Sequence, residues 1–271
     1  MVRQRFAELI SNSRSRLEIG NRGKWNKKVQ NTVGYQIMRS SETVQRHKTQ
    51  ISNFKIDSMK KPARIILLRH GEVENAGSVF YSQQDIHLSE RGRKQSLVLA
   101  DRLKDIPLSM IFSSDLSRCL FLAKAIAGER GLAVEARSEL READFGLWSG
   151  LGWDAVEAGY PGAILEYMKK PESYRPPQGE NLAEVALRVW RVIGEVLKEY
   201  KEKTVAIVSH GGVNRVLIAK AIGLSLNNIF FLEQDFACVN VLDFYQDGPV
   251  ILRLLNWSAD KGITRLLESS G

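Results

Sequence analysis

Two histidines occupy matching places in this sequence, each shortly after an apolar segment and each followed by glycine. The segment 64–68 is rich in β-branched residues and leads to His70, and the apolar segment 204–209 leads to His210. Such segments predict strands that are buried on both faces of a parallel sheet. Because ligands collect beyond the carboxyl ends of parallel strands, the matched pair predicts a functional site at that edge.

A third informative segment, residues 113–118, joins a predicted strand at 108–112 to a helix that ends near residue 128. We expect Ser114 or Asp115 to cap this helix and to place Arg118 at the same edge as the first histidine. A guanidinium beside the free N–H groups of a helix N-terminus forms a ready site for an anion.

Two carboxylates, Glu142 and Asp144, lie in the segment 140–150 among apolar and aromatic residues. A carboxyl group in such surroundings can serve as a general acid. A solvated loop is the alternative interpretation of this segment.

The predicted edge would gather residues from four elements, namely Arg69 with His70, Arg118, Glu142 and His210. Guanidinium groups and helix N–H groups suit a tetrahedral dianion, and a neutral imidazole is a competent nucleophile toward phosphorus. The combination predicts phosphoryl transfer through a phosphohistidine.

The composition is that of an ordinary globular protein. Its 271 residues, 44% of them hydrophobic, are enough for a sizeable core. No segment approaches the roughly 18 consecutive apolar residues of a membrane helix, and the N-terminus lacks the apolar core of a secretory signal. The two cysteines are too few for a disulfide framework or a four-thiolate zinc site. We therefore expect a cytoplasmic protein that does not bind membranes.

The excess positive charge lies in the N-terminal segment. Residues 1–61 contain 14 Lys and Arg against 4 Asp and Glu, a net of +10, whereas the remainder has 25 against 27, a net of −2. With little apolar periodicity, this basic extension is expected to be disordered. The alternatives are a targeting peptide, a weak nucleic-acid-binding arm, or sequence upstream of a start at Met59.

Strands alternate with helices from about residue 62 to residue 260, which predicts one α/β domain followed by a short tail, 261–271. Ser89 is the expected N-cap of one helix, and the helix 181–201 begins with a capping box formed by Asn181 and Glu184. Two segments at 236–244 and 250–256 predict a closing hairpin.

Six short motifs occur in a fixed order along this domain: RHGE at 69–72, LSERG at 88–92, SSDLSRC at 113–119, LREADFG at 140–146, PQGENL at 177–182 and SHGG at 209–212. Together they resemble the histidine phosphatase superfamily, in its phosphoglycerate-mutase-like branch. The resemblance implies a three-layer α/β/α fold with a mostly parallel central sheet.

The resemblance also implies a role for each matched residue. His70 would be the phosphorylated nucleophile, and the phosphoryl oxygens would be bound by Arg69, Arg118 and His210. Glu142 corresponds to the proton donor, with Asp144 as the second choice. No metal and no organic cofactor are needed in this family.

The loop after the first motif departs from the family pattern. Val73 and Ala76 stand where relatives commonly have Thr and Asn, with Asn75 as the displaced counterpart, and Tyr81-Ser82-Gln83 replaces the usual Tyr-Gly-Arg. The further expected substrate contacts are Gly211, Asn75 and Gln83.

The expected reaction is hydrolysis of a small phosphorylated metabolite. Residues 140–151 are most similar to α-ribazole phosphatases, and the segment after Glu142 lacks the long insertion of cofactor-dependent phosphoglycerate mutases. α-Ribazole phosphate and a sugar or glycerate phosphate are the candidate substrates. A phosphoglycerate mutase and a non-catalytic scaffold acting through the basic arm are the alternatives. A metal hydrolase with Glu72 and both histidines as ligands is less favoured, because the adjacent arginines would repel a cation.

Overall fold

The computed structural model describes residues 60–77 and 79–259. The predictions for residues 1–59 and for the tail 261–271 lie outside the described residues. The six strands are β1 (Ala63–Arg69), β2 (Met110–Ser114), β3 (Val134–Arg137), β4 (Thr204–Ser209), β5 (Val239–Phe244) and β6 (Val250–Trp257).

The helices that the structure describes are α3 (Glu90–Leu103), α4 (Ser117–Ala127), α5 (Trp153–Gly159), α6 (Ala163–Lys169), α7 (Leu182–Glu199) and α8 (Gly211–Ile222). Short 3-10 turns lie between them: η2 (Gly128–Arg130), η3 (Ser138–Leu140), η4 (Gly146–Trp148) and η5 (Leu226–Phe231).

The strands form one sheet in the order β3-β2-β4-β1-β5-β6. β3, β2, β4 and β1 are parallel, whereas β5 pairs antiparallel with β1, and β6 pairs antiparallel with β5. In the register of β1 with β4, Arg69 lies opposite Ser209, so the segments that follow the two strands leave the sheet side by side.

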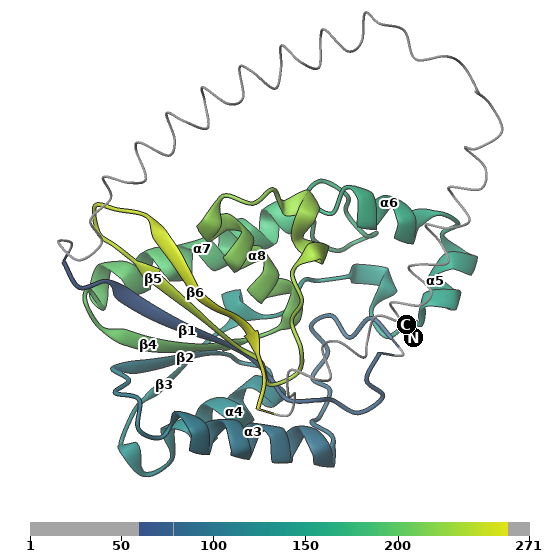
Figure 1. The fold of residues 1–271 in the computed structure, drawn as a ribbon. Coiled ribbons are helices and arrows are strands. Elements are labelled where there is room, and N and C mark those ends of the chain that lie inside the picture. The colour runs from purple at the N-terminus through teal and green to yellow at the C-terminus, as the bar shows by residue number, and fades with distance from the viewer. Residues whose placement is uncertain (1–59, 78, 260–271) are drawn as a thin grey trace, which may run out of the picture. The chain divides into compact units, whose positions relative to one another are not determined.

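Helices cover both faces of the sheet, with α7 and α8 on one side and α3 and α4 on the other (Figure 1). β1 shows why, since its side chains alternate between two apolar clusters. Ile65 and Leu67 belong to the cluster that includes residues of α7 and α8, and Ile66 and Leu68 belong to that of α3 and α4. The prediction of a three-layer fold with a mostly parallel sheet is confirmed.

Two helix starts are as predicted. The Ser89 side chain accepts a hydrogen bond from the Gly92 N–H at the start of α3. At the start of α7, Asn181 and Glu184 exchange both hydrogen bonds of a capping box. These caps satisfy N–H groups that would otherwise lack partners.

The predicted capping of α4 by Ser114 or Asp115 is wrong. β2 runs through Ser114, and Leu116 is the N-cap residue. Asp115 is engaged instead by Arg141, whose Nε and Nη2 donate to the two carboxylate oxygens at 2.7 and 2.6 Å. The first-turn N–H of Ser117 donates to Asp85 at 2.8 Å. This N–H group is therefore already hydrogen-bonded within the protein.

A separate aromatic cluster packs beside the sheet, around α5 and α6. Its buried members are Phe80, Trp148, Val156, Ile164 and Tyr167. Tyr167 contacts Phe145, Trp148, Tyr174 and Phe230 with ring centroids 5.8 to 6.1 Å apart.

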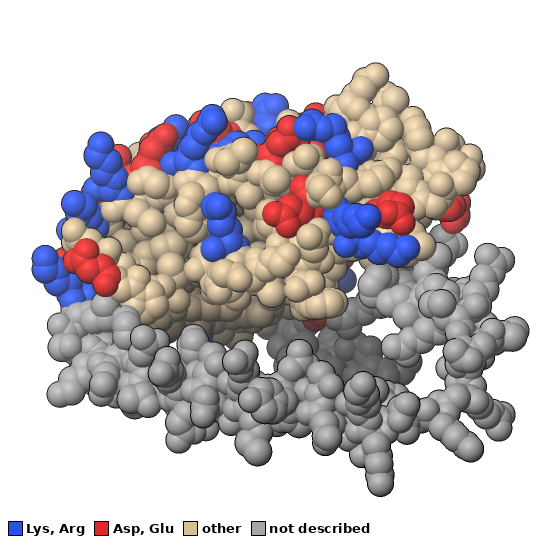
Figure 2. Space-filling view, turned by 90° about the horizontal axis from the view of Figure 1, so that it is seen from above, with Lys and Arg blue, Asp and Glu red and all other residues tan. Residues whose placement is uncertain are grey.

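Charged side chains of both signs are interspersed on the face seen in Figure 2. None of the helices in the described ranges is both long and apolar enough to cross a bilayer.

The loop after β1 is pressed against the first turn of α3. A Cβ on Gly71 would lie 2.2 Å from the Gly92 oxygen, and a Cβ on Gly92 would lie 1.9 Å from the Glu72 oxygen. The Glu72 oxygen also accepts the Ser89 N–H at 3.0 Å. Two of the sequence motifs therefore meet because only glycine permits this approach of backbone to backbone.

We predict that Gly92→Ala destabilises the protein by about 1–3 kcal/mol, since the added methyl group overlaps fixed backbone atoms. Gly159→Ala is the matched control, because no atom lies within 4 Å of a Cβ there. Urea unfolding of both variants measures the difference. Equal stability of the two variants would contradict this interpretation.

Candidate active site

His70 directly follows β1 and is buried. Its backbone N–H donates to the Ser209 oxygen at 3.1 Å, and its own carbonyl accepts the Ala237 N–H at 2.9 Å. The ring Nδ1 lies 2.7 Å from the Gly71 oxygen. Because a carbonyl oxygen can only accept, Nδ1 carries the proton, and in the neutral ring the lone pair lies on Nε2.

His210 directly follows β4, at the N-cap of α8, and is fully buried. Its ring centroid lies 5.1 Å from that of His70. Its Nε2 is 2.9 Å from the Ser114 hydroxyl. The structure thus brings together the two histidines that the sequence singled out.

Both imidazoles have a pKa well below the ordinary value of 6.5. For His70 the causes are burial and then the charges of Arg69 and Arg118. For His210 they are burial and then the charge of Arg118. Both rings are consequently neutral at pH 7, which leaves the His70 lone pair free to attack an electrophile.

Arg69 ends β1 and lies beside His70. Its Nη1 donates to the Gln234 oxygen at 2.5 Å, and its guanidinium carbon lies 4.0 Å from the centre of the Phe236 ring. Its Nε is buried and has no hydrogen-bond partner among the described residues. Burial, followed by the charge of Arg215, lowers the pKa of Arg69 to about 10. An unpaired buried donor on a cation is suited to an anionic ligand.

Arg118 lies in α4 and is buried. Its Nη1 donates to the Gln84 oxygen at 2.6 Å and its Nη2 to the Ser82 oxygen at 3.2 Å. Burial lowers its pKa. None of the ion pairs within the described ranges involves Arg69 or Arg118. The edge therefore carries positive charge that is available to a ligand.

Glu142 approaches the same edge from the segment after η3. Its Oε2 accepts the Gly212 N–H at 3.1 Å, and its Oε1 accepts the Ala143 N–H at 3.0 Å. A Cβ on Gly212 would lie 2.5 Å from Oε1, so glycine at this position allows the carboxylate to reach α8.

Arg188 of α7 holds the backbone that carries Glu142. Its Nη1 donates to the Glu139 and Arg141 oxygens at 2.6 and 2.8 Å, and its Nη2 donates to the Glu142 oxygen at 3.0 Å. Glu180 completes the arrangement, since it accepts from Arg188 and from the Asp144 N–H. Glu180, in the PQGENL motif, thus helps Arg188 to position the segment that carries Glu142.

Of the remaining predicted residues, Asp144 and Gln83 contact the segment around Glu142, and Asn75 lies at the surface. Asp144 accepts the Gly146 N–H at 2.9 Å and the Ser82 hydroxyl at 3.2 Å, which stabilises a turn. Gln83 donates to the Glu142 backbone oxygen at 3.2 Å. Asn75 is exposed, and its backbone oxygen accepts the Tyr81 hydroxyl.

Gly211 is a predicted substrate contact, and Glu72 is a predicted ligand in the alternative of a metal hydrolase. Gly211 lies against the Arg69 guanidinium. The Glu72 carboxylate accepts from Ser89 and Arg91 at the start of α3, so both of its oxygens are engaged away from the histidines. Among the described residues, no group of three or more His, Cys, Asp or Glu is arranged to hold a metal ion.

Sequence reasoning missed Arg188 and Arg215. Arg215 stands in the apolar sequence of α8, and a cation in a buried helix was the signal that could have identified it. Arg188 gave no comparable signal, because it belongs to a helix with many charged residues.

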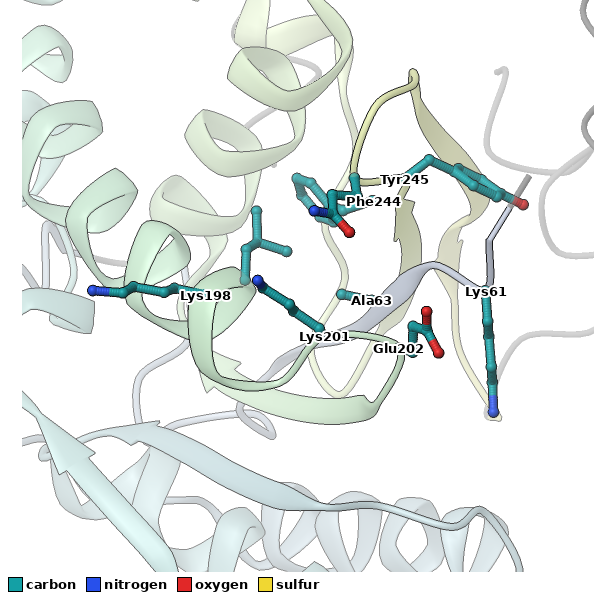
Figure 3. A pocket seen from close by; sticks show the side chains of 9 residues that line it. Lys61, Ala63, Lys198, Lys201, Glu202, Phe244 and Tyr245 are labelled. Carbon is teal, nitrogen blue, oxygen red and sulfur yellow. The ribbon is translucent and has the colours of Figure 1, made fainter.

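A pocket of 260 Å³ lies at the opposite edge of the sheet, near the start of β1 and the end of α7. Three lysines are among its lining residues, but the side chains of Lys61 and Lys198 point away from each other (Figure 3). They do not converge on one ligand position.

Residues 65–257 match the model of the histidine phosphatase superfamily, branch 1. The chain belongs to this superfamily. The match includes all six motifs, and the predicted family is confirmed.

The relatives of this histidine phosphatase described here are named as phosphatases. Phosphoserine phosphatase 1 of Hydrogenobacter thermophilus is 33% identical over 192 residues, 70% of this chain and 91% of that protein. Glucosyl-3-phosphoglycerate phosphatase of Mycobacterium tuberculosis is 33% identical over 174 residues, 61% of this chain and 78% of that protein.

Solved structures of the family share its fold. Mycobacterial glucosyl-3-phosphoglycerate phosphatase in complex with VO3 aligns with a TM-score of 0.67 and 30% identity over 72% of this chain and all of that one. The α-ribazole phosphatase of Shigella flexneri aligns with a TM-score of 0.66 and 28% identity over 72% of this chain and 96% of that one.

We predict that acid lowers the stability of this histidine phosphatase, because the imidazoles of His70 and His210 are buried and neutral. Below pH 6.5 the imidazole of His70 is protonated in the unfolded chain but stays neutral in the folded protein. The free energy of unfolding therefore falls as the pH decreases. His70→Gln should reduce that slope by up to about 1.4 kcal/mol per pH unit. Urea unfolding at pH 7.5 and 5.5 measures it. His87→Gln, at an exposed position, is the control, and an equal change of slope there would contradict the prediction.

Proposed function

We propose that this chain hydrolyses phosphomonoesters through a phosphohistidine formed on His70. The supporting observation is the hydrogen bond from Nδ1 to the Gly71 oxygen, which leaves the lone pair on Nε2. The charges of Arg69 and Arg118 act on this ring, and neither arginine forms an ion pair among the described residues. A dianionic phosphoryl group supplies the missing negative charge.

In the first step, Nε2 of His70 attacks phosphorus and the bond from phosphorus to the ester oxygen breaks. The phosphoryl oxygens are held by Arg69, Arg118 and His210, which stabilise the charge in the transition state. The carboxylic acid of Glu142 donates its proton to the departing oxygen, which leaves as an alcohol.

In the second step, a water oxygen attacks phosphorus and the bond from nitrogen to phosphorus breaks. The Glu142 carboxylate accepts a proton from that water, and inorganic phosphate is released. His70 returns to its neutral form with the proton still on Nδ1, so the cycle is complete.

The substrate is a small phosphorylated metabolite. Phosphoserine, glucosyl-3-phosphoglycerate and α-ribazole phosphate are candidates through the names of relatives. Gly211, Asn75 and Gln83 stay proposed contacts. Catalysis is assigned to residues 62–260, which contain the family match at 65–257. Both buried cysteines are free, which supports the proposed cytoplasmic location.

We predict His70-dependent phosphate release from a panel of phosphomonoesters, measured with a chelator present. The panel contains the three candidate substrates, 3-phosphoglycerate and p-nitrophenyl phosphate. Wild type should release phosphate and form a base-stable phosphoenzyme, whereas His70→Ala should do neither, because it lacks the nucleophile. His87→Ala is the control. Release that survives in His70→Ala would refute the assignment.

The same assay separates the alternatives. With 3-phosphoglycerate and a catalytic amount of 2,3-bisphosphoglycerate, isomerisation faster than phosphate release would show a mutase. No phosphoenzyme and no release from any ester would favour a scaffold that acts through the basic residues 1–61.

A second prediction concerns Glu142 as the proton donor. Glu142→Gln should lower kcat/KM for an alkyl phosphate by about 10²–10⁴-fold, and much less for p-nitrophenyl phosphate, because the nitrophenolate leaves without a proton. Asp144→Asn is the comparison variant and should cost little, since its carboxylate is engaged in a turn. The reverse ranking would transfer the role to Asp144.

A further inference from the structure

Arg215 is a third guanidinium near the site, and the reaction described above does not use it. It lies on α8, one turn after Gly211, and its Nε donates to the Leu232 oxygen at 2.7 Å. A Cβ on Gly211 would lie 3.2 Å from Cζ of Arg69 and 3.3 Å from Nη1 of Arg215. Two cations therefore flank the same backbone position.

Among the described residues, neither guanidinium of this pair is in direct contact with a carboxylate. No ion pair within 4 Å involves Arg215 in the part of the chain that the structure describes, and none involves Arg69. Burial lowers the pKa of Arg215, and the charge of Arg215 contributes to the lowered pKa of Arg69. Adjacent guanidiniums repel each other, so an anion bound beside them would be stabilised.

The surroundings of Arg215 indicate which part of a substrate it would meet. A Cβ on Gly212, the residue after Gly211, would lie 2.5 Å from Oε1 of Glu142, so Glu142 and Arg215 flank neighbouring backbone positions. The Glu142 charge accordingly opposes the lowering of the Arg215 pKa. The charges of Glu142 and Arg215 also act on the buried Tyr167, whose pKa is raised by burial and then by Glu142. Since the proposed proton donor must face the ester oxygen, the group attached to that oxygen would lie on the side of Arg215.

We propose that Arg215 binds a carboxylate on the leaving group of the substrate. The inference rests on the phosphatase function proposed above. With Nε engaged by Leu232, the two terminal nitrogens remain, and they match the two oxygens of a planar carboxylate. The substrate class is then phosphomonoesters that carry a carboxylate a few bonds from the ester oxygen.

A matched pair of esters tests this proposal. 3-Phosphoglycerate and glycerol 3-phosphate share a primary phosphate ester, and the first has a carboxylate where the second has a hydroxymethyl group. Wild type should prefer 3-phosphoglycerate, and Arg215→Met should reduce the ratio of the two kcat/KM values by at least about tenfold. Most of the loss should be in KM, because the carboxylate is bound equally in the ground and transition states.

Two control variants separate charge from structure. Arg215→Lys keeps the charge but not the planar group and should retain part of the preference. Arg191→Met removes an exposed cation from α7 and should leave both esters unaffected. Thermal unfolding of each variant establishes that it is folded. If Arg215→Lys lost as much as Arg215→Met, the hydrogen bond to Leu232 would be the relevant feature and the proposal would fail.

Other outcomes would also overturn it. Equal losses on both esters in Arg215→Met would assign Arg215 to the phosphoryl group or to the fold. An Arg215-dependent preference for fructose 1,6-bisphosphate over fructose 6-phosphate, without one for 3-phosphoglycerate, would identify a second phosphate in place of the carboxylate. No preference in wild type, together with His70-dependent release, would reject the carboxylate and leave the phosphatase function standing. No His70-dependent release from any ester would reject both.

Discussion

The parallel hydrogen bonding of β1 with β4 is the constraint on which the site depends. Their register places Arg69 opposite Ser209, and the His70 N–H then donates to the Ser209 oxygen. Both histidines therefore leave the sheet at the same height, with rings 5.1 Å apart between centroids. A slip of one residue in this pairing would turn one imidazole to the opposite face. The large buried clusters on both sides of β1 oppose such a slip.

Burial then gives the edge its chemical character. The same removal from water that keeps both imidazoles neutral also lowers the pKa of Arg69 and Arg118. The guanidiniums are held chiefly by backbone oxygens, which orient them without neutralising them. A site built in this way is poised for an anion, because the charge that would balance it comes with the ligand.

The loop that departs from the family pattern illustrates how backbone contacts tolerate change. Arg118 is anchored by the carbonyl oxygens of residues 82 and 84, so the side chains there can differ while the anchor stays. Ser82 adopts a φ of 54°, in the left-handed region that favours glycine, and its hydroxyl accepts the Phe145 N–H at 2.9 Å. Gln83 turns to the Glu142 backbone.

The sequence by itself determined the strands that end at the two histidines, the caps of α3 and α7, and the family. These features follow from apolar periodicity and from hydrogen bonds between residues three apart, which neighbouring residues decide. The tertiary structure decided that Asp85, 32 residues from Ser117, accepts the first-turn N–H of α4, and that Arg188 holds the backbone of Glu142 from 46 residues away. It also decided that Arg215 lies beside Arg69. Such contacts depend on how distant elements pack, and no local pattern records that distance.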